Sequence, residues 1–230
     1  MKFLYNILFL FLSVSAFAQN QIWKGYFSYN EVRAIAYSSS KTYFATDNAV
    51  FAWSDADETS EIYNSINGFK AFDISAIAHS SNFNKIIIGN TNGQIAIIDE
   101  VSGNVILLND IVNKNSIPDN IKKINDIYVE GNLAYVSTDY GISVIRLNDN
   151  NFGDSYYIGN SGEYTKVLQT TVVGGYIYSI TEDYGLKRIS VSNQNKIDYA
   201  QWQIYDTSKW LSIANLDGSL VGVKEDLTLN

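Results

Sequence analysis

The sequence has 230 residues, of which 46% are hydrophobic and 17% charged, and it carries a net charge of −8. This length and apolar content suit one folded unit with a buried core and exclude an intrinsically disordered chain. The negative charge and the lack of a Lys/Arg cluster argue against a nucleic-acid partner, and the absence of cysteine excludes disulfide bonds and thiolate chemistry.

The first 18 residues have the pattern of a secretory signal peptide. Lys2 precedes an apolar run over residues 3–12, and small residues then lead to Ala16-Phe17-Ala18. We expect cleavage after Ala18, so that residues 19–230 form an exported protein in the periplasm or at the outer-membrane cell surface, with no transmembrane segment. The apolar residues between 19 and 30 predict a strand that joins the sheet of a neighbouring unit.

From residue 32 onward, one β-strand pattern recurs along the chain. Short apolar segments begin near Val32, Ile74, Ile124, Val167 and Trp210, and each is followed by turns rich in Asn, Ser and Gly. The second copy shows the whole unit, with four predicted strands at residues 74–79, 85–89, 94–99 and 105–109. Four strands in roughly 45 residues, with no helical period between them, are typical of a β-propeller blade.

The predicted fold is therefore all-β, a β-propeller of four-stranded antiparallel blades over residues 19–230. The repeats amount to about four and a half blades, which predicts an incomplete ring. A β-sandwich is the alternative, but a sandwich does not require the same four-strand pattern to recur at such regular spacing.

The second turn of the repeat has a conformational requirement of its own. Gly93, Gly141 and Gly185 occupy equivalent places there, and we expect each to adopt the positive φ that a tight hairpin needs. Ala49 and Thr228 stand at the same place in the first and last copies. Those two hairpins are predicted to have a different turn geometry.

The sequence offers little for catalysis or metal binding. His79 is the single histidine, and no second His or Cys exists to complete a metal site with it. Carboxylates recur near the second turn, and we interpret them as turn residues rather than as the paired acids of a glycosidase. These residues are Asp47, Asp139, Asp183 and Asp226. We predict a non-enzymatic protein with no catalytic residue, no metal site and no cofactor.

Two tyrosines are the candidate binding residues. Tyr140 and Tyr184 occupy equivalent turn positions in adjacent repeats, and they are predicted to project from one propeller face near residues 64–69 and 113–120. Aromatic side chains at such a rim suit the binding of a glycan or a protein partner. The alternative is that each ring lies over the hairpin of its own blade.

Five phrases, in order along the chain, resemble one known family. They are WKGYFSYN (residues 23–30), NIKKIN (120–125), FGDSYYIG (152–159), QTT (169–171) and DYAQW (198–202). The chain resembles, from about Ile22 to its last residue, the N-terminal propeller of the PorZ family of the type IX secretion system in Bacteroidota. None of these phrases is a catalytic signature.

The resemblance implies a function that the residues alone do not. PorZ-like proteins belong to a cell-surface attachment complex with the sortase-like PorU and with PorV and PorQ, and they are implicated in delivering anionic lipopolysaccharide to the sortase. A secreted interaction module of this type is the leading hypothesis. The alternatives are the periplasmic, carbohydrate-sensing propeller of a two-component regulator and, less favoured, a propeller glycosidase or lyase.

Overall fold

The computed structural model describes residues 31–65, 68–69 and 72–225. The predicted signal peptide, the strand expected between residues 19 and 30, and the turn position Thr228 lie outside these ranges. Within them the fold is all-β, interrupted by the short helix α2 (Asp110–Asn113) and two 3₁₀ turns, Asp119–Ile121 and Tyr199–Gln201. No helix in the described ranges has the length and apolar character needed to cross a membrane.

The strands form four four-stranded antiparallel sheets and one two-stranded sheet, each with its strands in chain order. Blade 1 contains β1 (Ala34–Tyr37), β2 (Thr42–Ala45), β3 (Val50–Ser54) and β4 (Thr59–Tyr63), and blade 2 contains β5 (Ile74–Ser80), β6 (Lys85–Asn90), β7 (Ile95–Asp99) and β8 (Val105–Leu108). Blade 3 contains β9 (Ile124–Glu130), β10 (Leu133–Thr138), β11 (Gly141–Arg146) and β12 (Asn151–Tyr156). Blade 4 contains β13 (Val167–Val173), β14 (Tyr176–Thr181), β15 (Gly185–Ser190) and β16 (Gln203–Asp206), and blade 5 contains β17 (Trp210–Leu216) and β18 (Ser219–Lys224).

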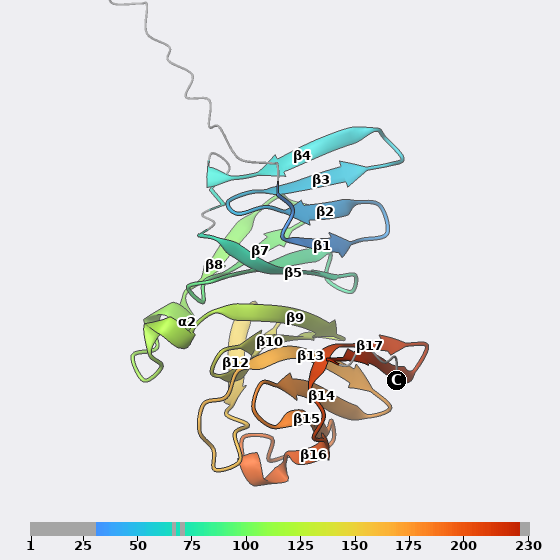
Figure 1. The fold of residues 1–230 in the computed structure, drawn as a ribbon. Coiled ribbons are helices and arrows are strands. Elements are labelled where there is room, and N and C mark those ends of the chain that lie inside the picture. The colour runs from blue at the N-terminus through green and yellow to red at the C-terminus, as the bar shows by residue number, and fades with distance from the viewer. Residues whose placement is uncertain (1–30, 66–67, 70–71, 226–230) are drawn as a thin grey trace, which may run out of the picture.

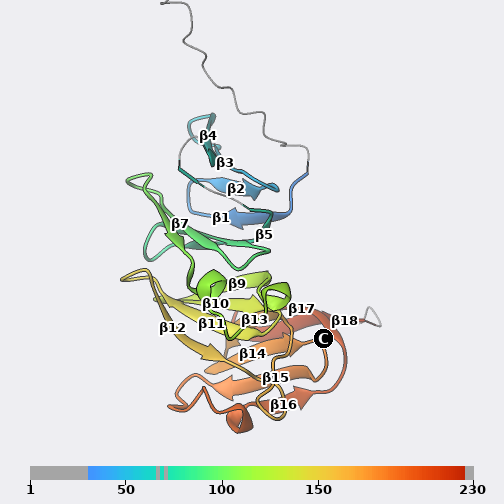
Figure 2. The same cartoon turned by 90° about the vertical axis from the view of Figure 1, so that its left-hand side faces the viewer.

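The five sheets follow one another around a common centre. The first strands of successive blades are neighbours, with β1 against β5, β5 against β9, β9 against β13 and β13 against β17. Figure 1 shows β1, β5, β9 and β13 one below the other, with β17 to the right of β13, and Figure 2 shows the sheets as an arc around their shared centre. The predicted propeller of four-stranded blades with an incomplete ring is therefore confirmed.

The hydrophobic core lies in the seams between blades, because each strand turns alternate side chains toward opposite neighbours. In blade 2, one row across the sheet consists of Ile77, Ile88, Ala96 and Leu107, and it packs against blade 1. The adjacent row, which includes Ile95, packs against blade 3. Two further clusters fill the seams between blades 3 and 4 and between blades 4 and 5.

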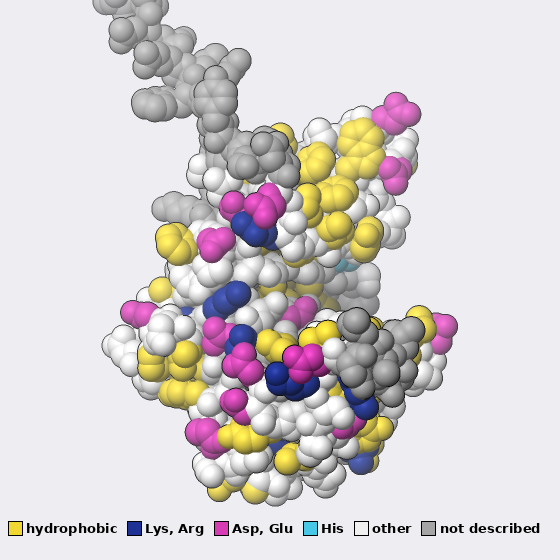
Figure 3. Space-filling view, viewed as in Figure 1, with side chains coloured by type: hydrophobic (Ala, Val, Ile, Leu, Met, Phe, Trp, Pro, Cys, Tyr) yellow, Lys and Arg dark blue, Asp and Glu magenta, His cyan; other side chains and the backbone are white. Residues whose placement is uncertain are grey.

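The first blade carries the same kind of row without a described neighbour on that side. Ile35, Phe44, Phe51 and Ile62 align across its four strands. Ile35 and Ile62 are 45% and 41% exposed, whereas their counterpart Ile77 in blade 2 is 8% exposed. In Figure 3 this sheet forms part of the apolar surface at the upper right.

The hairpin glycines behave as predicted. Gly93, Gly141 and Gly185 have φ values of 89°, 144° and 71°. Ala49 is not among the positive-φ residues of the described chain, so the first hairpin does have a different geometry. The turn has a second feature that the repeat pattern does not predict. A threonine at the end of the second strand, or one residue beyond it, donates its hydroxyl to a backbone carbonyl on the other side of the turn, as in Thr46 to Ala49 at 3.0 Å and Thr138 to Gly141 at 2.9 Å.

Candidate binding site

Tyr140 does not project from the propeller face as the sequence predicts. Its side chain is completely buried in the seam between blades 2 and 3, where it packs with Ile111 and Ile117 of the connection between these blades. The rings of Tyr157 and Tyr164 lie 6.2 and 6.4 Å from the Tyr140 ring, centroid to centroid. Burial raises the pKa of Tyr140 to about 12. The physical reason for the difference is that this connection folds back over the turn and covers the ring.

Tyr184 takes the equivalent place at the next seam and stays partly exposed. Its hydroxyl donates a hydrogen bond to the carboxylate of Glu163, in the connection between blades 3 and 4. This hydrogen bond is the main reason why the pKa of Glu163 falls to about 2. Both tyrosines thus lie against the connection that precedes their own blade.

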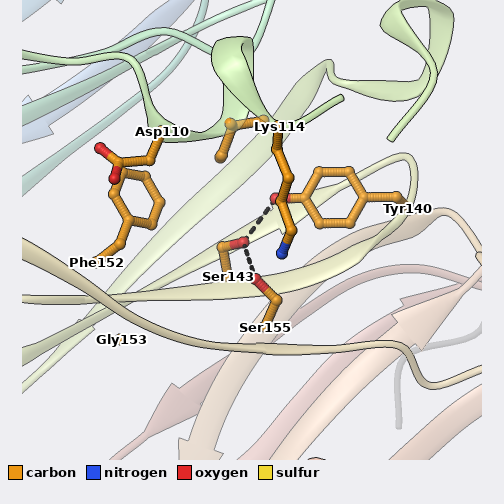
Figure 4. Close-up of a pocket in the computed structure, with 8 residues that line it drawn as sticks. Asp110, Lys114, Tyr140, Ser143, Phe152, Gly153 and Ser155 are labelled. Atoms are coloured by element: carbon orange, nitrogen blue, oxygen red, sulfur yellow. Dashed lines mark hydrogen bonds between the residues drawn. The ribbon is translucent and has the colours of Figure 1, made fainter. Parts of the chain in front are cut away.

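The Tyr140 hydroxyl begins a short hydrogen-bonded chain. It lies 2.6 Å from the Ser143 hydroxyl, which in turn lies 2.9 Å from the Ser155 hydroxyl. These groups border a cavity of about 220 Å³ between helix α2 and the outer strands of blade 3, which we call the Tyr140 hollow (Figure 4). Its lining residues are Asp110, Ile111, Lys114, Tyr140, Ser143, Phe152, Gly153 and Ser155.

The hollow exists because blade 3 has a short side chain where blade 4 has a long one. Ser143 pairs with Val136 in the sheet, and at the same place in blade 4 Lys187 pairs with Ser179. The Lys187 side chain is buried, and its Nζ donates to Ile158 O at 2.6 Å and to the side chain of Asn160 at 3.0 Å. Lys187 therefore fills the space beside its own connection, whereas Ser143 leaves the equivalent space open.

Two charged groups in the Tyr140 hollow have no protein partner. Within the described residues, Lys114 and Lys123 are the two lysines that make neither a hydrogen bond nor an ion pair, and Lys114 only rests with its Nζ 5.6 Å from the Tyr157 ring centre. The Asp110 carboxylate also has no partner among the described side chains. Figure 4 shows Lys114 reaching toward the two serines while Asp110 lies on the other side, near Phe152. An ammonium group, a carboxylate, hydroxyls and two aromatic rings form a polar pocket suited to a small polyhydroxylated acid.

His79 lies far from this hollow, in the seam between blades 1 and 2. Its Nε2 is 2.6 Å from Glu100 Oε2, and the Tyr43 hydroxyl donates to the other Glu100 oxygen. The His79 and Glu100 side chains are only 7% and 12% exposed. No group of three His, Asp or Glu residues within the described part of the chain could hold a metal ion.

We expect Glu100→Ala to destabilise the fold by about 2–3 kcal/mol, because it leaves His79 and the Tyr43 hydroxyl without their partner inside a seam. Urea unfolding measures this change. Glu130→Ala, at an exposed carboxylate that accepts one hydrogen bond from Tyr128, is the control and should cost well under about 1 kcal/mol. Equal losses in the two variants would contradict a structural role for the His79–Glu100 pair.

The recurring carboxylates bind residues next to the inner strands. Asp47 pairs with Arg33 at 2.7 Å, and Asp139 accepts a hydrogen bond from Asn125 at 2.8 Å. Asp183 lies 3.4 Å from the Thr165 hydroxyl. Asp226, the fourth of these residues, lies outside the described ranges. The three described residues thus tie the second turn to the start of an inner strand, which fits their interpretation as turn residues.

A fold of repeated four-stranded antiparallel blades whose inner strands surround one centre defines the class of β-propeller proteins. The sequence matches the family described as the N-terminal β-propeller domain of PorZ of the type IX secretion system over residues 42–203. The chain therefore belongs to this family, which confirms the resemblance seen in the sequence. No curated protein matches the chain in sequence.

Solved structures agree on the fold. PorZ of Porphyromonas gingivalis, described as an essential bacterial surface component of the type IX secretion system, is 19% identical with a TM-score of 0.76. That match covers 89% of this chain but 27% of PorZ, so the chain spans about a quarter of that protein. The computationally designed protein Ika8 is 13% identical with a TM-score of 0.55, and its match covers 86% of this chain and 69% of the designed one.

Proposed function

We propose that the chain is a non-enzymatic binding module of the type IX secretion system that holds anionic lipopolysaccharide at the cell surface for a sortase of the PorU type, in a complex with PorV and PorQ. Membership of the PorZ propeller family supports a place in this system. The pattern of a signal peptide in residues 1–18 supports export. The observation that supports this ligand is the Tyr140 hollow, where Lys114 and Asp110 both lie unpaired, among the described residues, beside a chain of hydroxyls.

The chemistry of the hollow fits one acidic sugar residue. The Lys114 ammonium group pairs with the acidic group of the sugar, and the Asp110 carboxylate accepts hydrogen bonds from sugar hydroxyls. The Ser155 hydroxyl offers a further donor and acceptor, and the Phe152 ring offers an apolar surface for the carbon-bound face of the sugar. The partly enclosed site strengthens these polar interactions relative to open water.

The hollow favours binding over hydrolysis. Among its described lining residues Asp110 is the single acid, whereas most glycoside hydrolases need two carboxylates across the scissile bond. Among the described residues, the hydrogen-bond partners of the Ser143 hydroxyl are the hydroxyls of Tyr140 and Ser155, so no histidine or carboxylate is placed to accept its proton. A carbohydrate-sensing propeller would use the same contacts, but membership of the PorZ family favours the secretion system.

The experiment fills the hollow without changing charge. Ser143→Gln places a longer neutral side chain where blade 4 accommodates Lys187, and its amide can donate to the neighbouring connection as Lys187 does. We expect at least about a 10-fold loss of affinity for the purified polysaccharide of anionic lipopolysaccharide, measured by isothermal titration calorimetry.

Ser60→Gln is the matched control, because Ser60 is exposed on β4 in blade 1. It should bind the polysaccharide as the wild type does, and circular dichroism should show that both variants are folded at the temperature of the titration. A wild-type protein that does not bind this polysaccharide, or a Ser143→Gln variant that binds it with undiminished affinity, would refute the proposed function or its site.

A further inference from the structure

A second hollow lies at the inner rim of the same propeller face, where the connection between blades 2 and 3 meets β9. It has a volume of about 290 Å³ and we call it the Lys123 hollow. Its lining residues are Arg33, Asp73, Ile74, Ser75, Thr91 and Lys123. Like the Tyr140 hollow, it contains one of the two lysines that have no partner among the described residues.

Lys123 is unpaired because blade 3 breaks a pattern of the rim. In blades 1, 4 and 5 the residue before the inner strand is basic and pairs with a carboxylate that follows the second strand of the same blade. These pairs are Arg33–Asp47 at 2.7 Å, Lys166–Glu182 at 3.0 Å and Lys209–Glu225 at 3.3 Å. Figure 3 shows Lys and Arg side chains alternating with Asp and Glu down this side of the molecule. In blade 3 the carboxylate of Asp139 accepts instead from the amide of Asn125, at 2.8 Å, which leaves Lys123 exposed and free.

Blade 2 departs from the rim pattern in the opposite direction. Asp73 stands where the other blades have a basic residue, and it adopts a left-handed φ of 56°. The Thr91 backbone N–H donates to the Asp73 carbonyl at 3.0 Å, and the Thr91 hydroxyl lies 3.3 Å from Asp73 Oδ2. The second carboxylate oxygen of Asp73 has no hydrogen-bond donor among the described residues. It is therefore available to hydroxyl groups of a ligand in the Lys123 hollow.

The two hollows thus repeat one chemical arrangement at the two ends of one connection. Each has a free ammonium group, an aspartate with an unused oxygen, and hydroxyl side chains, and each is bordered by part of residues 110–123. A third cavity, of about 390 Å³, is lined by residues 112–122 of the same connection, including Asn113, Asn115 and Asp119. β9 at the inner rim and the outer strands of blade 3 are two to three strand spacings apart, or roughly 10–15 Å.

From this repetition we propose that the 110–123 connection is a platform with two subsites, which binds two acidic sugars of one polysaccharide chain at the same time. This inference rests on the proposed function and adds its geometry. The anionic group of one sugar pairs with Lys114 and that of another pairs with Lys123, while the aspartates accept hydrogen bonds from sugar hydroxyls. A chain long enough to reach both subsites gains affinity because its second contact is intramolecular.

The test measures affinity against chain length. Defined oligogalacturonates of two and six residues serve as probes, with neutral maltohexaose as the uncharged control, in calorimetric titrations of the full chain. The wild type should bind the hexamer at least about 10-fold more tightly than the dimer. Lys114→Gln and Lys123→Gln should each remove this gain, and the double variant should also lose most of the binding to the dimer. Lys209→Gln removes a rim lysine that is paired with Glu225, and it should bind both probes as the wild type does.

The purified anionic lipopolysaccharide is titrated in parallel, so that the second subsite and the proposed function can be refuted by different results. If the wild type binds this lipopolysaccharide and Lys123→Gln binds it and the hexamer with wild-type affinity, the second subsite is refuted and the proposed function stands. If the wild type does not bind the lipopolysaccharide, the proposed function falls, and the platform falls with it. Equal binding of maltohexaose and the galacturonate hexamer would refute the charge pairing at both lysines.

Discussion

The Asp126→Asn variant is expected to be more stable than the wild type at pH 7.5, by about 1–3 kcal/mol in free energy of unfolding. Asp126 lies on the inner strand β9, beside Ser137 in the sheet and against Thr170 of blade 4. Burial raises the pKa of this carboxyl to about 6, although backbone hydrogen bonds from Thr170 and Ile127 partly oppose the shift. At pH 7.5 the ionised Asp126 carboxylate is therefore less stable in the folded protein than it is in water in the unfolded chain.

The sign of the pH dependence follows from linkage. The pKa of Asp126 in the folded state is above the unfolded value of 3.8. The folded protein therefore binds more protons than the unfolded chain between about pH 4 and pH 6. As a result, Asp126 makes the free energy of unfolding fall as pH rises through that window. Asn cannot ionise, so the stability difference between variant and wild type should grow from about pH 4 and level off above about pH 6.

Urea unfolding from pH 3.5 to 8 measures this difference. Asp154→Asn, at an exposed carboxylate on β12, is the control and should follow the wild type at every pH. A variant at Asp126 that is less stable than the wild type at pH 7.5 would mean that the folded state stabilises the carboxylate, contrary to the direction given by its burial.

The propeller itself is readable from the sequence because its determinants are local. The turn glycines at positions 93, 141 and 185 and the recurring apolar strands fix the hairpins, and four hairpin-linked strands per repeat leave few alternatives. The rim pattern was also readable, since the residues before the strands that begin at Ile124 and Val167 are both lysines. What the pattern cannot give is the partner of each lysine, because that depends on the side chain of Asn125 reaching Asp139.

The candidate site was only half predictable for the same reason. Tyr140 and Tyr184 share a turn position, but whether a ring is covered depends on the path of the preceding connection, which the pattern of strands and turns does not specify. One signal was available in the sequence. The phrases Tyr140-Gly-Ile-Ser143 and Tyr184-Gly-Leu-Lys187 differ conservatively at their third residue and strongly at their last, and the difference between a serine and a lysine opens the Tyr140 hollow.

Gly141→Ala is expected to be strongly destabilising, with a loss of about 3 kcal/mol or more. Gly141 has a φ of 144°, a conformation that L-residues rarely adopt. A Cβ at this position would also overlap the backbone carbonyl oxygen of Tyr156, and a backbone atom held in a sheet cannot move aside as a flexible side chain can. Thermal unfolding followed by circular dichroism measures the loss.

Gly174→Ala is the comparison for this loss. Gly174 also has a positive φ, 57°, but a Cβ there would meet no atom within 4 Å, so its substitution adds only conformational strain and should cost about 1 kcal/mol. The excess in Gly141→Ala then combines the clash with the end of β12 and the greater backbone strain at a φ of 144°. Tyr157 directly follows Tyr156 in the chain and packs on the Tyr140 ring. A shift of Tyr156 that relieves the clash would therefore also move the wall of the Tyr140 hollow. We expect the folded fraction of Gly141→Ala to bind the polysaccharide of anionic lipopolysaccharide less tightly than Gly174→Ala does. Equal stability losses in the two variants would show that backbone strain alone, and not the approach of Tyr156, requires glycine at position 141.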